Sequence, residues 1–187
     1  MFRRRSKPQP PTKEDVAKRK KRIDEISAEV ERGNFERAIE LAVRCVENYK
    51  GKDPFGDAFC SYLVGHSLVC KHLSNASPPN YLETKISFAD YNKAKTYLNR
   101  SLEIYDFFAR NKRFERNRRL KSATVLIDMV LLESIARKWD KAIKACTRSL
   151  DIYKKYEFRK GMQLATQMML NLRLKKIFFD IKQFAGL

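Results

Sequence analysis

Three stretches of 15 residues decide the fold, because they align with one another without a gap: FERAIELAVRCVENY (35–49), YNKAKTYLNRSLEIY (91–105) and WDKAIKACTRSLDIY (139–153). Each stretch begins with an aromatic residue, has Ala at its fourth position and ends in Tyr. Between these points come Arg at the tenth position, a small residue at the eleventh, Val or Leu at the twelfth and an acid at the thirteenth. Agreement of this kind at three places indicates an internal repeat.

The shared positions have the spacing of one face of a helix. The fourth and eleventh residues are seven apart, which is two helical turns, so both lie on the same side. Both are small, and we expect them where two helices approach closely; the pairs are Ala38 and Cys45, Ala94 and Ser101, and Ala142 and Ser149. The Arg at the tenth position precedes an acid by three residues, so we expect these two side chains to pair on a solvated surface.

The composition agrees with one helical domain. The chain has 187 residues, of which 43% are hydrophobic, and only 6 Gly and 6 Pro. This length allows a real core, and so few helix breakers favour a mostly helical protein. The sequence predicts seven helices, of which the third is apolar nearly all round and is expected in the middle of the stack. Their approximate bounds are 13–32, 35–50, 54–74, 85–109, 113–137, 139–156 and 159–184.

The segment GNFERAIE (33–40) and its counterparts resemble the second helix of a tetratricopeptide repeat (TPR). The resemblance covers roughly residues 17–156. It implies an all-α fold in which three antiparallel helical hairpins stack as a TPR-like α-solenoid, closed by a C-terminal capping helix with a polar outer side. We expect residues 1–12 to be a flexible basic arm and residues 13–187 to be the TPR-like helical repeat domain.

The repeat period is longer than that of the family. Ala38 and Ala94 are 56 residues apart, and Ala94 and Ala142 are 48 apart, whereas the TPR unit has about 34 residues. Two insertions account for the difference. The first, residues 74–84, contains a Pro-Pro pair and is expected to be a loop, and the second, residues 110–119, is expected to extend a helix or its turn.

The resemblance also implies where a partner would bind. TPR arrays bind peptides or helices in a concave groove lined by the first helix of each pair. The corresponding residues here give the groove an apolar and aromatic middle with basic ends, which suits an amphipathic peptide that carries acidic residues. These residues are Lys20, Ile23, Ser27, Phe59, Tyr62, His66, Thr124, Ile127, Leu131, Thr166, Met169, Arg173 and Lys176.

A net charge of +18 exceeds what solubility requires and indicates an acidic partner. Nucleic acid, an acidic protein surface and anionic lipid all remain open, but no helix combines an apolar face with a basic face in the way that lipid binding needs. Basic residues gather in the arm, in the run 18–22 and in a basic patch before the fifth helix. That patch consists of Arg110, Lys112, Arg113, Arg116, Arg118, Arg119 and Lys121.

The sequence contains no motif that carries catalytic chemistry. Phosphate-binding loops, nucleophile elbows and zinc-protease motifs are all missing, so we expect neither an enzyme nor a bound cofactor. His66 and Cys70 share a helix face and could supply half of a zinc site, whereas His72 should point elsewhere. Because no second pair has a suitable spacing, no metal is expected. The four cysteines should be reduced packing residues.

Two functions of different classes therefore stay open. The first is a non-enzymatic TPR-like module, or a scaffold subunit of a larger assembly, that binds an acidic protein or peptide. The second is a basic RNA-binding or ribonucleoprotein subunit that contacts phosphates. No membrane partner is expected, since no apolar run reaches the length of a span. The expected location is intracellular: the run 18–22 resembles a nuclear localisation signal, and the alternatives are the cytoplasm and, from the acid-free N-terminus, the mitochondrion.

Overall fold

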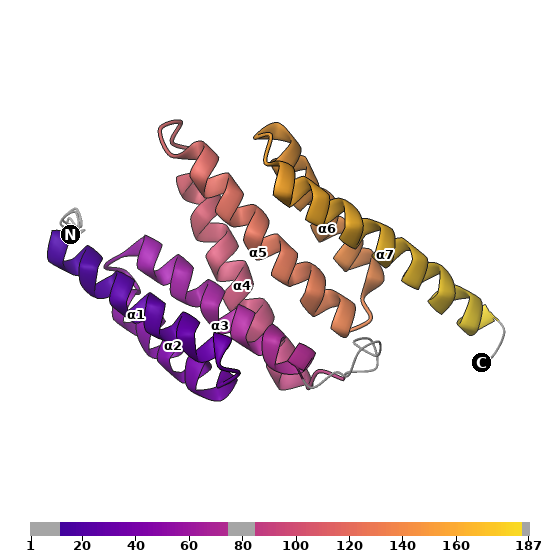
Figure 1. The fold of residues 1–187 in the computed structure, drawn as a ribbon, viewed down its shortest axis with the longest axis horizontal. Helices are drawn as coiled ribbons and strands as arrows, with labels where there is room; N and C mark the ends of the chain where they lie inside the picture. Colours follow the sequence, from indigo (N-terminus) through magenta and orange to yellow (C-terminus); the bar gives the residue numbers. More distant parts are fainter. Residues whose placement is uncertain (1–11, 75–84, 185–187) are drawn as a thin grey trace, which may run out of the picture.

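The chain folds entirely into helices over residues 12–74 and 85–184, which are the residues that the computed structural model describes (Figure 1). Within these ranges there are seven helices and no strand, as the sequence predicts. Only the starts of the fourth and fifth helices come later than expected. The helices are α1 (Lys13–Glu31), α2 (Phe35–Tyr49), α3 (Pro54–Ser74), α4 (Phe88–Phe108), α5 (Glu115–Ile135), α6 (Trp139–Lys155) and α7 (Arg159–Phe184). The predicted arm and most of the Pro-Pro insertion lie outside the described residues.

Neighbouring helices pack against each other along the whole chain. Each helix from α2 to α7 contacts the helix before it, α1 also lies beside α3, and α3 also lies beside α5. Figure 1 shows the chain progressing from α1 at one side of the molecule to α7 at the other. This succession of contacts supports a helical stack, in which each element gains its core from its neighbours in sequence.

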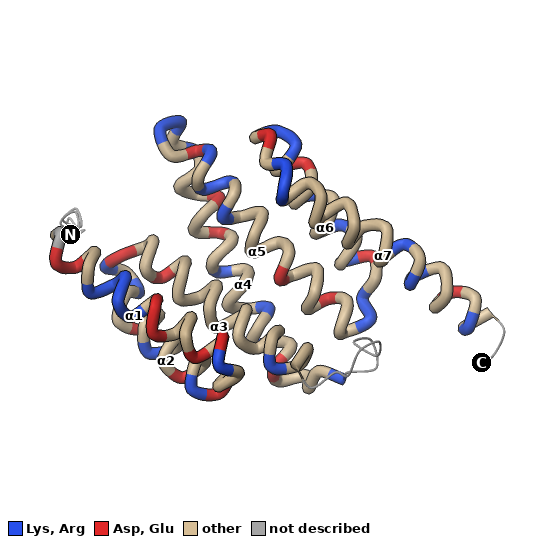
Figure 2. The backbone as a smooth tube through the Cα atoms, in the orientation of Figure 1, with Lys and Arg blue, Asp and Glu red and all other residues tan. Residues whose placement is uncertain are grey.

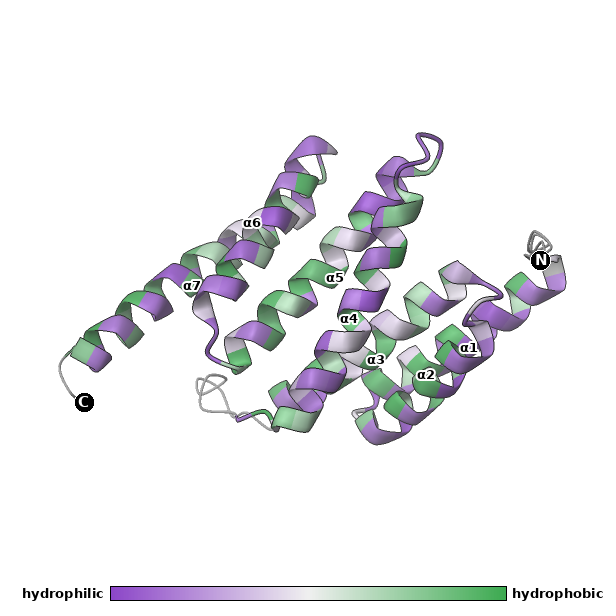
Figure 3. Ribbon diagram, turned by 180° about the vertical axis from the view of Figure 1, so that it is seen from behind, coloured by the Kyte–Doolittle hydropathy of each residue, from purple (hydrophilic) through white to green (hydrophobic). Residues whose placement is uncertain are grey.

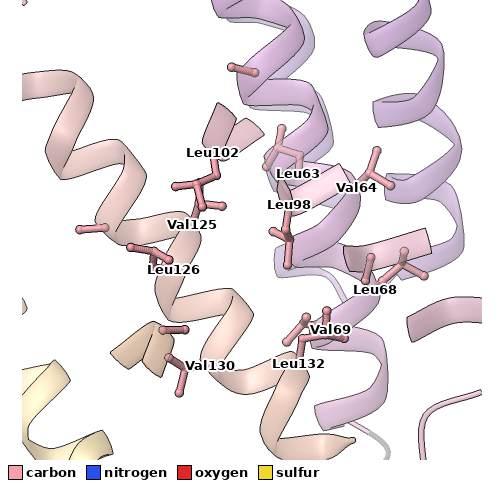
Figure 4. Close-up of a cluster of buried hydrophobic side chains, with 14 of the residues drawn as sticks. Leu63, Val64, Leu68, Val69, Leu98, Leu102, Val125, Leu126, Val130 and Leu132 are labelled. Carbon is pink, nitrogen blue, oxygen red and sulfur yellow. The ribbon is translucent and has the colours of Figure 1, made fainter. Parts of the chain in front are cut away.

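The repeated small residues lie in the closest helix contacts. Ala38, Ala94 and Ala142 are completely buried, as are Ser101 and Ser149. Twelve of the 21 residues of α3 are buried, which confirms its predicted central position. Figure 4 shows the middle of the core, to which α3 contributes Leu63, Val64, Leu68 and Val69 and to which α4 and α5 also contribute.

Gly65 marks the closest approach between α3 and α4. A Cβ atom at this position would lie only 2.5 Å from Cγ of Leu98 and 3.3 Å from the carbonyl oxygen of Ala94. Ala94 is the fourth residue of the second repeat, and Leu98 lies one turn further along the same face. The absence of a side chain at Gly65 thus allows α4 to approach, and the repeated alanine provides the second half of the same contact.

The expected pairing of each repeated arginine with the acid three residues later is wrong. Arg44 instead bonds to Glu40 at 2.6 Å, one turn back. Arg100 reaches across to α3, where its Nε and Nη2 donate to the buried Asp57 at 2.7 and 2.5 Å, and Arg148 reaches Asp106 on α4. For Arg100 the reason is that the buried carboxylate of Asp57 needs a cation, whereas the exposed acid three residues on can be solvated by water.

The outer side of α7 is apolar, so the expected capping role is not confirmed. A terminal helix that closes a stack needs a polar outer side. Here α7 buries Gly161, Ala165 and Leu172, yet it also exposes large apolar side chains. Figure 3 shows that hydrophobic residues are interspersed with hydrophilic ones along the whole of α7. They are Leu164, Leu170, Leu174, Ile177, Phe178, Ile181 and Phe184.

Candidate interaction surface

The thirteen residues of the predicted groove lie on α1, α3, α5 and α7, and every one of them is exposed or half-buried. The fully buried residues of the same helices, such as Ile26, Val64 and Val130, occupy other positions. The structure therefore leaves the predicted residues accessible. Their contacts decide which of them form one surface.

The aromatic residues of α3 form the middle of this surface. The rings of Phe59 and Tyr62 have their centroids 5.9 Å apart, and Tyr62 stacks on His66 at 5.4 Å with an interplanar angle of 20°. His66 Nδ1 lies 2.8 Å from Oδ2 of Asp128 on α5. Because Asp128 follows Ile127 and precedes Leu131 by less than one turn, the α3 and α5 parts of the predicted groove are adjacent.

Asp128 is a residue that the groove prediction missed. It is a buried carboxylate within the apolar run VLIDMVLL (125–132), and a buried charge needs a partner. The sequence shows an acid within an apolar run, and this pattern indicates a buried carboxylate. It could not identify His66 as the partner, because His66 lies 62 residues away.

His66 is protonated at neutral pH. Partial burial lowers the pKa of its imidazole, but the hydrogen bond to Asp128, the contact with Cys70 and the negative charge of Asp128 outweigh this effect and raise the pKa to about 10. Burial, with the charge of Asp128 as a second cause, raises the pKa of the neighbouring Tyr62 hydroxyl. The centre of the surface thus holds an ion pair that joins α3 to α5 and a neutral tyrosine.

We expect the stability contributed by this ion pair to fall as the pH rises. A histidine whose folded pKa is above its unfolded pKa stabilises the folded state fully below the unfolded value of about 6.5, and loses this effect as the pH passes through about 10. His66→Gln should therefore lower the free energy of unfolding at pH 7 and remove part of the decline between pH 7 and 10. Urea unfolding at several pH values measures the difference.

His72 provides the control. The chain has only two histidines, so an NMR titration resolves both imidazoles. His66 should keep its proton through pH 8, and His72→Gln should leave the His66 titration unchanged. A titration of His66 near 6.5 would show that Asp128 does not hold the proton there.

On α7, one of the predicted groove residues is already paired within the protein. Lys176 pairs with Asp140 at the start of α6, so its ammonium group is directed toward α6. The side of α7 that meets α5 instead presents Met168, Asn171 and Lys175. Together with Leu131 of α5, these residues line a pocket of about 280 Å³. The predicted residues Thr166, Met169, Arg173 and Lys176 do not line this pocket, and their membership of the groove stays a prediction.

The basic patch is only partly free. Arg119 donates to Asp106 at 2.9 Å, and that carboxylate also holds Arg148. The guanidinium of Arg118 lies 3.5 Å from the ring centroid of Phe55, and burial lowers its pKa. Arg118 and Arg119 thus differ from the rest of the basic patch, because both connect α5 to other helices.

The other five cations of the patch are exposed, and among the described residues they pair with no acid. Figure 2 shows the positive charge at the turn between α4 and α5, where Arg110 lies over the Phe107 ring at 5.6 Å and Arg113 over Phe114 at 5.5 Å. Lys121, one turn or more into α5, lies 5.2 Å from the Phe59 ring.

One pocket connects the basic patch to the groove. It has a volume of about 440 Å³. Its lining contains Arg118 and Lys121 of the patch, Thr124 of the groove, and the rings of Phe114 and Phe158. The two sites that the sequence predicted separately are thus parts of one surface. Its chemistry is aromatic and apolar along α3 and α5, with unpaired cations at one end.

No arrangement for metal chemistry is found in residues 12–74 and 85–184. No group of three or more His, Cys, Asp or Glu side chains converges there. Cys70 Sγ lies 3.6 Å from Nε2 of His66, but His72 bonds to Asp90 of α4 at 3.0 Å and so points elsewhere, as expected. All four cysteines are free, and Cys45, Cys60 and Cys146 are buried.

The chain matches no protein-family model, no curated protein and no solved structure. Among the helices in the described ranges, none has the length and apolarity needed to span a bilayer. The function must therefore be argued from the surface itself.

Proposed function

We propose that this protein is a non-enzymatic, TPR-like interaction module that binds an acidic segment of a protein partner along α3 and α5. The observation that carries the proposal is the continuity of the aromatic groove with unpaired cations, through the pocket between Lys121 and Phe158. A partner helix or peptide would place apolar side chains against Phe59 and Ile127 and its carboxylates near the cations.

The residues of this surface support binding better than they support a structural role. Aromatic rings that only build a core are normally buried, whereas Phe59 and Tyr62 are half-buried and Phe114 and Phe158 are exposed. Contiguous exposed apolar area beside charged residues is typical of protein interaction sites. An unpaired cation such as Lys121 adds complementarity to an acidic partner and increases the rate of association.

Site-specific photo-crosslinking tests this proposal. A photoreactive residue is introduced at the exposed Thr124 in the groove, and at the exposed Thr96 on α4 as a matched control. In cell lysate we expect Thr124 to capture a protein whose adduct survives nuclease treatment, and Thr96 to capture none. Equal adducts at both positions, or loss of the Thr124 adduct after nuclease, would contradict the proposal.

RNA binding is the second candidate, and the turn between α4 and α5 favours it. Its exposed Phe107 and Phe114 rings lie under Arg110 and Arg113, and stacking surfaces beside cations are used for single-stranded nucleic acid. Contacts of this kind would be made mainly to phosphates and bases without reading a sequence. They would weaken steeply with salt.

Charge reversal in the turn distinguishes the two candidates. Lys112→Glu, Arg113→Glu and Arg116→Glu change only exposed, unpaired cations, and they spare Arg119, whose reversal would place a carboxylate beside Asp106. We expect this triple variant to weaken binding of an acidic amphipathic peptide by about 1 kcal/mol or more for each lost contact.

The matched control reverses three exposed lysines of α6, Lys141, Lys144 and Lys154, and should bind like the wild type. Titrations with the peptide and with a single-stranded RNA are made at two salt concentrations, alongside melting curves. Tighter binding of the RNA with a steep salt slope would favour the second candidate. Unchanged affinity for both ligands in the triple variant would show that the turn is only a solvated surface.

A further inference from the structure

The exposed side of α7 carries an apolar stripe with regular spacing. Its members are separated by 4, 3, 4 and 3 residues, and about half or more of each side chain is exposed, up to 98% for the last. They are Leu170, Leu174, Ile177, Ile181 and Phe184. At 3.6 residues per turn they lie on the side opposite the buried Ala165 and Leu172. The helix therefore has one apolar side that is packed and another that is not.

This spacing suits a helix as the occupant. Apolar residues that alternate by 4 and 3 form the seam of a pair of helices, because they return to the same side every two turns. The stripe extends over 15 residues. The 14 steps from its first to its last member correspond to about 21 Å at 1.5 Å per residue. An extended strand would need partners for its backbone groups, which a helix surface does not offer.

A cleft beside the stripe carries uncompensated positive charge. It has a volume of about 530 Å³, with an apolar floor formed by Trp139, Phe178 and Phe179. Arg137, Lys175 and Lys182 also line it, and no acid is among the described residues of its lining. Lys175 is partly buried at the junction of this cleft with the pocket against α5, and burial lowers the pKa of its ammonium group.

Trp139 forms part of the apolar wall of the cleft. The residue is only 8% exposed, yet it is among the residues that line the cleft. Its indole ring is therefore held in place by the core and presents only an edge of its apolar surface to an occupant.

We propose that the outer side of α7 and the cleft at Trp139 dock an amphipathic helix of another protein, with apolar residues along the stripe and carboxylates along the edge that enters the cleft. The apolar contacts would cover Leu174 and Ile177. The carboxylates would pair with Arg137, Lys175 and Lys182, which line the cleft.

The charge of α7 argues against a second copy of this chain as the occupant. The helix contains six basic residues and a single acid, Asp180, so two copies in contact would bring twelve cations together. The undescribed segments of the chain are also unsuited. Residues 1–11 contain no acid, and residues 75–84 contain one acid and two adjacent prolines.

This site is distinct from the surface of α3 and α5 proposed above, and it can be tested separately. Trp139 is the only tryptophan, so its fluorescence reports on the cleft directly. The probe is a tryptophan-free helical peptide with Leu at the seam positions and Glu on both flanks. A second peptide has Lys in place of every Glu. Binding of the full chain to the Glu peptide should shift the Trp139 emission, and the Lys peptide should bind at least tenfold more weakly.

The variants change exposed residues, so a loss of peptide binding is not caused by a loss of folding. Ile177→Glu with Ile181→Glu should weaken the Glu peptide at least tenfold, whereas Leu164→Glu, also on α7 but outside the stripe, should not. Lys182→Glu should weaken it, and Lys144→Glu on α6 should not. The Thr124 crosslink should persist in all of these variants. A failure of the α7 site to bind the peptide can thus be distinguished from a failure of the function proposed for α3 and α5.

Four results would overturn the proposal. The first is equal affinity for the Glu and Lys peptides, and the second is unchanged affinity in Ile177→Glu with Ile181→Glu. The third is a dimer of the full chain at micromolar concentration that these two substitutions dissociate, since the stripe would then be covered by a second copy. The fourth is a Trp139 shift with phosphatidylserine-containing vesicles and none with the Glu peptide, since the stripe would then bind lipid.

Discussion

Replacing Gly65 with Ala is expected to lower the free energy of unfolding by about 1–3 kcal/mol. The new Cβ atom would lie 2.5 Å from Cγ of Leu98, which is completely buried and cannot move aside, and 3.3 Å from the carbonyl oxygen of Ala94. Elsewhere in a helix the same change stabilises, because Ala is the better helix former. The sign of the effect therefore reports directly on the distance between α3 and α4.

A double-mutant cycle isolates this contact. Leu98→Ala alone should cost about 2–5 kcal/mol, since it leaves a cavity in the core. In the Leu98→Ala background the Cβ at position 65 enters vacated space, so the cost of Gly65→Ala should nearly vanish and the coupling energy should reach about 1–3 kcal/mol. Urea unfolding of the wild type, the two single variants and the double variant gives the four free energies of unfolding that the cycle needs. Additive effects would mean that α3 and α4 are further apart than described.

Ala142→Phe is expected to destabilise by about 1–3 kcal/mol or more, because overpacking separates α6 from its neighbours. Ala142 is completely buried in a helix that packs on both α5 and α7. Ala89→Phe introduces the same side chain at an exposed position of α4 and should change the stability by less than about 0.5 kcal/mol. Thermal melting of both variants measures the contrast, and equal melting temperatures would refute the assigned register of the third repeat.

The helices and their buried sides could be predicted because the information is local. Ala38, Ala94 and Ala142 recur at one place in a helical pattern, and a small residue on a helix face indicates a close neighbour wherever the chain goes next. The capping box formed by Thr12 and Asp15 at the start of α1 is local in the same way, since its two residues are only three apart. The residues of the predicted groove are exposed or half-buried, and their role as a groove stays a prediction.

The contacts between helices could not be predicted in the same way. Arg100 has acids nearby in sequence but bonds to Asp57, 43 residues away, because Asp57 is buried and must be compensated. Arg118 and Arg119 looked like members of a free cluster, yet one lies on Phe55 and the other bonds to Asp106. Which cations remain free to meet a partner depends on which acids the fold brings within reach.

The sequence by itself determined the helical repeat, the positions of the small residues and the excess of positive charge. Periodicity and composition act along the chain, so they can be read without knowing the fold. Only the tertiary structure decided that the groove and the basic patch meet at Lys121, that His66 pairs with Asp128, and that α7 leaves one apolar side open. These features depend on how each helix is rotated about its axis relative to its neighbours. That rotation is determined by packing between residues far apart in the sequence.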